Sequence, residues 1–93
     1  MAHILFIDDN LDVQKLLHVA LKRKKQHELT LASNGEEGLT LAANHKFDLV
    51  LLDIMMPDMD GYEVARRLRA EPRTQHLPII MFTSRAQSAD AEA

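Results

Sequence analysis

The chain has 93 residues, of which 46% are hydrophobic and 27% are charged, an ordinary mixture for one globular domain. Its formal net charge of -3 provides no basic field that would attract nucleic acid or an anionic membrane, so we expect neither as a partner. The chain contains no cysteine, which excludes disulfides and thiolate metal sites. With no signal-peptide pattern and no membrane-spanning run in view, we expect a cytoplasmic protein.

The first third of the chain predicts a strand followed by a helix. Residues 4–7 are continuously apolar, which is typical of a strand buried on both faces. Residues 11–25 carry apolar side chains at helical spacing, which predicts a helix with one inward stripe. The predicted stripe contains Val13, Leu16, Leu17, Ala20 and Leu21.

A second strand and a second helix follow. Residues 28–33 alternate between apolar and polar, with Leu29 and Leu31 on one face, which predicts a half-buried or edge strand. Residues 34–46 open with an asparagine–glycine pair suited to a cap and a turn, and then read as a helix. We expect Gly38 to weaken this helix, because glycine is a poor helix former.

The third strand is predicted for residues 48–53, an apolar run that ends on Asp53. A loop follows, because Pro57 and Gly61 interrupt regular structure. Residues 62–70 read as a third helix. Its inward face is predicted to contain Val64, Ala65 and Leu68.

The last predicted strand covers residues 77–84 and is apolar enough to be buried on both faces, and Ser88 then resembles the N-cap of another helix. The alternation of strands and helices predicts an α/β fold with a parallel sheet and helical crossovers. Only the second strand has an edge pattern, so we expect the other three to be interior strands.

Polar side chains follow three of the predicted strands. They are Asp8, Asp9, Asp53, Thr83 and Ser84. The carboxyl ends of parallel strands lie at one edge of the sheet, where such folds bind ligands, so we expect these side chains to meet there. Three crowded carboxylates repel one another, and a hard divalent cation such as Mg²⁺ would neutralise them. A cation beside an aspartate and a hydroxyl suits phosphoryl transfer to a carboxylate.

Simpler interpretations exist for each acid alone. Asp8 and Asp9 could be helix caps, and Asp53 could merely begin a loop. Asp58 and Asp60 are expected to be turn and cap residues without chemistry. The placement of three acids after neighbouring strands favours the site over these separate roles.

Other acid motifs fit the chain poorly. An EF-hand loop built around Gly61 would need acids where Met56 and Arg67 stand. A haloacid-dehalogenase-like phosphatase would need a second acid where Met55 or Asn10 stands. The chain also lacks a lysine-containing glycine loop of the kind that cradles phosphates.

Three strings, "ILFIDDN", "LLDIMMPDMDG" and "PIIMFTS", together resemble the receiver domain of bacterial two-component response regulators, with chemotaxis regulators among its members. The resemblance covers essentially all 93 residues. It implies a flavodoxin-like, doubly wound parallel sheet with its four strands in the order 2-1-3-4.

The resemblance also implies roles for the residues at the strand ends. Asp53 would be the phosphoacceptor, and Thr83 the switch hydroxyl that grips the phosphoryl group. Asp9 and Asp53 would ligate Mg²⁺ directly, Asp8 would act partly through water, and the main-chain carbonyl of Met55 would add another oxygen. The phosphoryl donor would be a histidine kinase, a phosphotransfer protein or a small phosphodonor. Such a domain is a signalling module and not an enzyme, apart from Mg²⁺-dependent self-phosphorylation.

The resemblance further implies a fourth helix, a fifth strand and a fifth helix, together with a lysine that contacts the phosphoryl group. The sequence ends at Ala93, so we expect residues 1–93 to be one truncated domain that lacks the fifth strand and the last helix, with impaired phosphotransfer. An open edge on the fourth strand would then favour a homodimer or a larger self-assembly. The alternative function is a self-associating fragment with a structural role and no phosphotransfer.

Overall fold

The computed structural model of this chain describes residues 2–22 and 27–83. Strands and helices alternate in this part of the chain, as predicted. In chain order they are β1 (Ala2–Ile7), α1 (Leu11–Lys22), β2 (His27–Ala32), α2 (Gly35–Asn44), β3 (Leu49–Asp53), α3 (Gly61–Ala70) and β4 (Ile79–Phe82). Three predicted features lie outside the described residues: the end of the first helix at residues 23–25, Ser84, and the helix start at Ser88.

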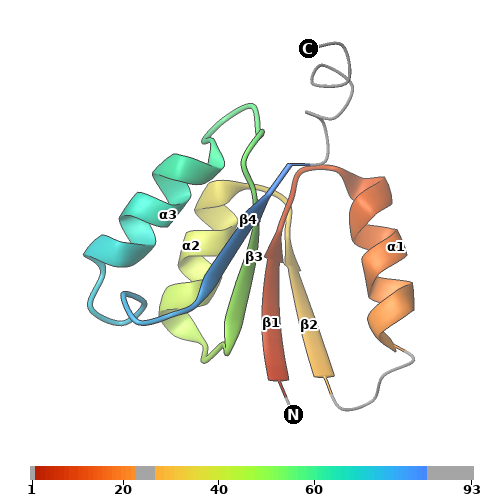
Figure 1. The fold of residues 1–93 in the computed structure, drawn as a ribbon, viewed down its shortest axis with the longest axis horizontal. Coiled ribbons are helices and arrows are strands. Elements are labelled where there is room, and N and C mark those ends of the chain that lie inside the picture. The colour runs from red at the N-terminus through yellow and green to blue at the C-terminus, as the bar shows by residue number, and fades with distance from the viewer. Residues whose placement is uncertain (1, 23–26, 84–93) are drawn as a thin grey trace.

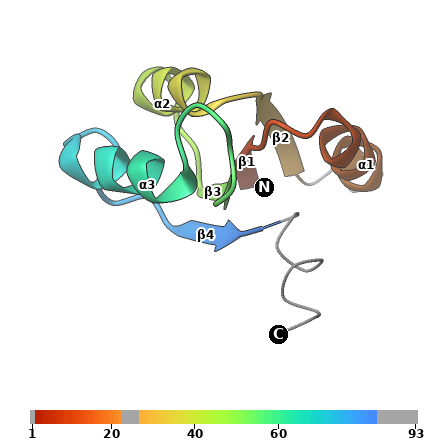
Figure 2. The same ribbon diagram turned by 90° about the horizontal axis from the view of Figure 1, so that it is seen from above.

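The four strands form one parallel sheet in the order β2-β1-β3-β4, which confirms the predicted flavodoxin-like arrangement (Figure 1). Helices α2 and α3 cover one face of the sheet, and α1 lies on the other side (Figure 2). The predicted edge position of β2 is confirmed. Within the described sheet β4 is the opposite edge, and Ile80 is 53% exposed. The prediction that the fourth strand is covered on both faces is therefore wrong for these residues.

The hydrophobic core lies between the sheet and the helices α2 and α3. Leu5 pairs with Val50, and Ile7 pairs with Leu52, so these four apolar side chains share one face of the sheet. All four are fully buried. From α3 they meet Val64 and Leu68, two members of the predicted inward face, and Ala65 is partly buried beside them.

Gly38 is buried where α2 crosses β1. A Cβ atom added there would lie 2.4 Å from Cδ1 of Ile7, which is closer than two carbon atoms can approach. Glycine carries the helix-propensity cost that the sequence predicts. It also allows α2 to pack directly against the side chain of Ile7, which no larger residue would permit without movement.

The single inward stripe predicted for α1 is wrong in part. Leu16 is 73% exposed and Ala20 is also exposed, whereas Val13 is partly buried. The physical reason is the position of the helix. Its principal contacts are with β2, the edge strand, and not with the centre of the sheet. Only a narrow side of α1 therefore touches the sheet. The side chains of Leu17 and Leu21 lie outside the described part of the structure.

Candidate metal centre at the carboxyl edge of the sheet

The three predicted acids meet at the carboxyl edge of the sheet. Asp8 and Asp9 follow β1 directly, and Asp53 is the last residue of the neighbouring strand β3. Ile7 is the register partner of Leu52, so the chain places Asp8 and Asp53 side by side. One carboxylate oxygen from each of the three acids lies within 4.8 Å of the other two.

Asp8 is fully buried and only partly hydrogen-bonded. Its Oδ1 accepts a hydrogen bond from the main-chain N–H of Asn10 at 3.0 Å, but its Oδ2 has no hydrogen-bond partner. Burial raises the pKa of the Asp8 carboxyl group from 3.8 to about 6, against the opposing effect of the Asn10 hydrogen bond. The nearby Asp53 and Asp9 carboxylates contribute to the same increase.

Asp53 has a similar environment. It is fully buried, its Oδ1 accepts a hydrogen bond from the main-chain N–H of Met55 at 3.1 Å, and its Oδ2 has no hydrogen-bond partner. Two buried carboxylate oxygens that face a third acid need a positive partner, because an unpaired buried charge is costly. The donor set consists only of oxygen atoms, which is the set that Mg²⁺ prefers in proteins. These residues therefore fit a hard divalent cation.

Thr83 and Met55 extend the same edge. Phe82 is the register partner of Asp53, and the main-chain N–H of Ile54 donates to the Phe82 carbonyl at 2.7 Å. Thr83 therefore leaves β4 at the edge where Asp53 ends β3, and it is partly buried. Met55 is held to Asp53 through its main-chain N–H, while its side chain is 48% exposed.

Gly61 closes the loop after Asp53. Its N–H donates to the Ile54 carbonyl at 2.9 Å. A Cβ atom at this position would lie 2.6 Å from the Asp53 carbonyl oxygen and 2.8 Å from Cα of Ile54. The sequence identified Gly61 only as a loop residue. The structure shows that a close approach of two backbone segments requires glycine there.

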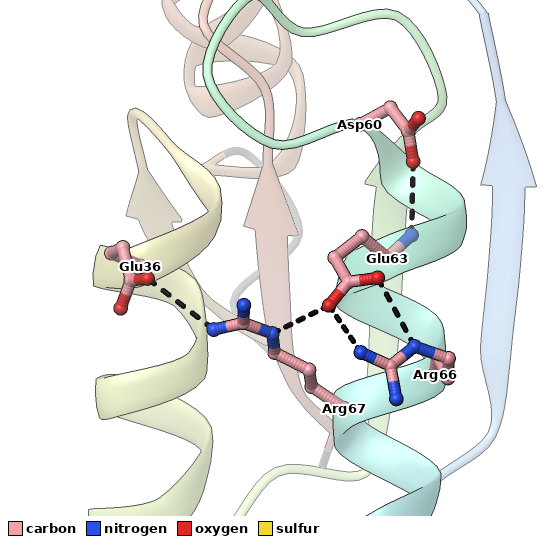
Figure 3. A network of polar contacts seen from close by, with 5 residues as sticks. All are labelled: Glu36, Asp60, Glu63, Arg66 and Arg67. Carbon is pink, nitrogen blue, oxygen red and sulfur yellow. Dashed lines mark hydrogen bonds and ion pairs between the residues drawn. The ribbon is translucent and has the colours of Figure 1, made fainter.

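The helix that begins at Gly61 is anchored by a polar network (Figure 3). Asp60 caps α3, as predicted, by accepting a hydrogen bond from the N–H of Glu63 at 2.9 Å. Arg67 binds Glu63 at 2.7 Å and reaches Glu36 on α2 at 3.5 Å. Hydrogen bonds from Arg66 and then from Arg67 lower the pKa of Glu63 to about 2. The network joins the two helices that cover the core face.

Sequence reasoning missed one buried polar side chain next to the acids. Gln14 on α1 is only 6% exposed, and its amide nitrogen donates to the carbonyl oxygens of Asp8 at 2.6 Å and Ala32 at 2.9 Å. In the sequence it looks like an ordinary surface residue of an amphipathic helix. The contact depends on how α1 sits against the ends of β1 and β2, which no local pattern encodes.

A doubly wound parallel sheet with three clustered aspartates at its carboxyl edge defines an α/β domain whose acids could hold a divalent cation. Residues 4–93 match the family model of the response regulator receiver domain, and the chain belongs to this family of two-component signalling domains. No helix within residues 2–22 and 27–83 is long and apolar enough to cross a membrane.

Similarity to individual proteins agrees with this family. The chain is 40% identical over 90 residues to the transcriptional regulatory protein AfsQ1 of Streptomyces coelicolor, covering 97% of this chain and 38% of AfsQ1. The receiver domain of the sensor histidine kinase PA1611 from Pseudomonas aeruginosa, solved with magnesium coordinated in its active-site cleft, is 31% identical with a TM-score of 0.82. That match covers 98% of this chain and 74% of the other.

A third match comes from a complex. A chain of the complex between the histidine kinase ThkA and the response regulator TrrA is 37% identical, with a TM-score of 0.79. The match covers 90% of this chain and 70% of that chain.

Proposed function

We propose that this receiver domain, formed by residues 1–93, accepts a phosphoryl group on Asp53. Mg²⁺ would be held by the carboxylates of Asp8, Asp9 and Asp53 and by the main-chain carbonyl of Met55. The observation that carries the proposal is the pair of buried carboxylate oxygens, Asp8 Oδ2 and Asp53 Oδ2, that have no hydrogen-bond partner within a three-acid cluster.

The capping interpretation explains these acids less well. Helix α1 already has a cap, because Asn10 Oδ1 accepts hydrogen bonds from the N–H groups of Asp12 at 2.9 Å and Val13 at 3.2 Å. Neither Asp8 nor Asp9 is needed for that role. A buried, unsatisfied polar atom costs about 1–3 kcal/mol, and more when it is charged. A bound cation would offset this cost.

The proposed reaction moves one phosphoryl group. An oxygen of the Asp53 carboxylate attacks phosphorus, an O–P bond forms, and the P–N bond to the donor imidazole breaks with its electron pair left on nitrogen. That nitrogen then takes a proton from water. Bound Mg²⁺ supplies positive charge that offsets the repulsion between the carboxylates and the phosphoryl oxygens.

Two residues of the chain assist the acceptor in this proposal. The N–H of Met55 holds Asp53 Oδ1, which orients the carboxylate before the reaction. The hydroxyl group of Thr83 donates a hydrogen bond to an oxygen of the transferred group. The partner is a histidine kinase or a phosphotransfer protein, which is supported by the similarity to a chain from the complex between ThkA and TrrA.

Labelling by a small phosphodonor tests the proposal. Incubation with acetyl phosphate and Mg²⁺ should add the mass of one phosphoryl group, detected by intact mass spectrometry. Asp53→Asn should abolish the addition, because the amide cannot act as the nucleophile. Asp58→Asn is the matched control, since Asp58 is an exposed acid of the following loop, and it should retain the addition. Equal labelling of Asp53→Asn and the unsubstituted chain would exclude Asp53 as the acceptor.

A second candidate function is self-association through β4, with a structural role that needs no phosphotransfer. The supporting observation is an apolar edge: within the described residues β4 pairs only with β3, and Ile80 on it is exposed. Such an edge can pair with a second copy of the chain. A solution mass equal to that of one chain at micromolar concentrations would contradict this second function.

A further inference from the structure

Gln14 connects α1 to the ends of two strands. Its amide nitrogen donates one hydrogen bond to the carbonyl oxygen of Asp8, directly after β1, and another to that of Ala32, the last residue of β2. A primary amide nitrogen has two hydrogens, so both are used. The side chain is buried, which removes water as an alternative donor for either carbonyl.

The same contacts fix the main chain of Asp8. Its N–H donates to the Ala32 carbonyl at 3.1 Å, and its own carbonyl accepts from Gln14. Its Oδ1 accepts from Asn10, so only Oδ2 is left without a partner. The peptide between Asp8 and Asp9 is planar, and fixing the Asp8 carbonyl therefore also fixes the plane from which Asp9 departs.

We propose that Gln14 is a positioning residue for the divalent cation, which sets the separation of the Asp8 and Asp9 carboxylates and thereby favours Mg²⁺ over Ca²⁺. The inference rests on the proposed function, in which these acids ligate the ion. Mg²⁺ requires a near-ideal octahedron with ligands at about 2.1 Å, whereas Ca²⁺ accepts more ligands in flexible geometries at about 2.4 Å. Loss of fixed carboxylate positions should therefore weaken Mg²⁺ binding more than Ca²⁺ binding.

Gln14→Met tests this inference, because methionine has a similar length and volume but no hydrogen-bond donor. The chain contains no tryptophan, so calorimetric titration of the full chain with MgCl₂, and separately with CaCl₂, is a suitable measurement. Removing a residue that orients metal ligands typically weakens metal binding by about tenfold or more. We expect the Mg²⁺ dissociation constant to rise by about tenfold and the Ca²⁺ constant to rise by a smaller factor.

Thr74→Val is the matched control. Thr74 is as buried as Gln14, and its hydroxyl donates to the Leu68 carbonyl at 2.7 Å, but it lies after α3, towards the amino ends of the strands. The control should lower the free energy of unfolding and leave both dissociation constants unchanged.

If circular dichroism shows that Gln14→Met does not fold, Gln14→Asn replaces it. Asparagine keeps the donors but is one methylene too short to reach both carbonyls.

The outcomes separate the two proposals. A larger loss of Mg²⁺ than of Ca²⁺ affinity in the Gln14 variant alone supports positioning. Equal losses for the two ions, no loss, or the same selective loss in Thr74→Val would overturn the inference while leaving the proposed function intact. Failure of the unsubstituted chain to bind either ion would overturn both.

Discussion

Asp8 is a residue whose burial opposes folding when its carboxyl group is ionised. Its carboxyl group is fully buried, and burial raises its pKa to about 6. The ionised form is therefore less favourable in the folded chain than in an unfolded chain, where the pKa is near 3.8. A cation that binds the ionised form would reverse this preference. Ionised Asp8 therefore destabilises the folded chain unless a cation binds it.

The stability of the chain should consequently fall as the pH rises from about 5 to about 7 in the presence of EDTA. A carboxyl group whose pKa is raised by folding stabilises the folded chain fully at pH values below its pKa in the unfolded chain. This stabilisation is lost as the pH rises through its pKa in the folded chain. The rise in the pKa of Asp8 from 3.8 to about 6 corresponds to about 3 kcal/mol of stability at most. Urea denaturation across this range measures the loss.

The control for this effect is Asp8→Asn, in which the free energy of unfolding should change little with pH above pH 5. Glu63 does not confuse the result, because its pKa is lowered to about 2. The contribution of Glu63 to stability is present above its ordinary pKa of 4.5 and is lost only below that pH. An unsubstituted chain whose stability is constant from pH 5 to 7 would contradict the assignment to Asp8.

The sequence predicted the clustered acids but not the neighbouring residues that contact their main chain. Asp8, Asp9 and Asp53 could be predicted because parallel strands must bring their carboxyl ends to one edge. Gln14 and Gly61 could not, because each acts through a contact with main-chain atoms that are distant along the chain or brought close by a turn. Such contacts depend on packing, which leaves no periodic pattern.

The strands and helices were predicted correctly where a single hydrophobic pattern determines the type and position of the element. The strands and helices occur in the predicted order, and the alternating pattern of β2 indicated its edge position correctly. Helix α1 was harder, because periodicity marks an apolar stripe but not how much of the sheet the helix covers. Its position beside β2 leaves Leu16 exposed.

Gly38 gives a prediction at the element scale, because two effects oppose each other there. Alanine would favour the helix by about 1 kcal/mol through its higher propensity. Its Cβ atom would, however, lie 2.4 Å from Cδ1 of Ile7, and overpacking of this kind typically costs about 1–3 kcal/mol. Gly38→Ala should therefore lower the free energy of unfolding, measured by urea denaturation.

Ile7→Val provides the matched test, because it removes the Cδ1 atom that the new methyl group would strike. The double variant should be less destabilised than the sum of the two single variants. Additive losses would show that the clash with Cδ1 of Ile7 does not determine why glycine stands at this position; the Cγ1 atom, 2.8 Å from the added Cβ, remains in valine.

Among the described residues, one face of the sheet is less covered by other elements than the opposite face. Register places Phe6, Leu51 and Ile80 side by side across β1, β3 and β4, on the face opposite the core side chains of Leu5 and Val50. Phe6 is covered by Phe82, with ring centroids 5.4 Å apart, but Ile80 is more than half exposed. The row therefore becomes more exposed towards β4.

This gradient leads us to expect a homodimer or larger assembly in which a second copy covers β4. Light scattering at micromolar concentrations should give a mass above the 10.5 kDa of one chain. Ile80→Lys should return that mass to one chain while the melt stays cooperative, because a charge is tolerated at an exposed site but not in an apolar interface. Tyr62→Lys is the control, since Tyr62 is also more than half exposed but lies on α3, and it should leave the assembly intact. A monomer mass for the unsubstituted chain would refute this expectation.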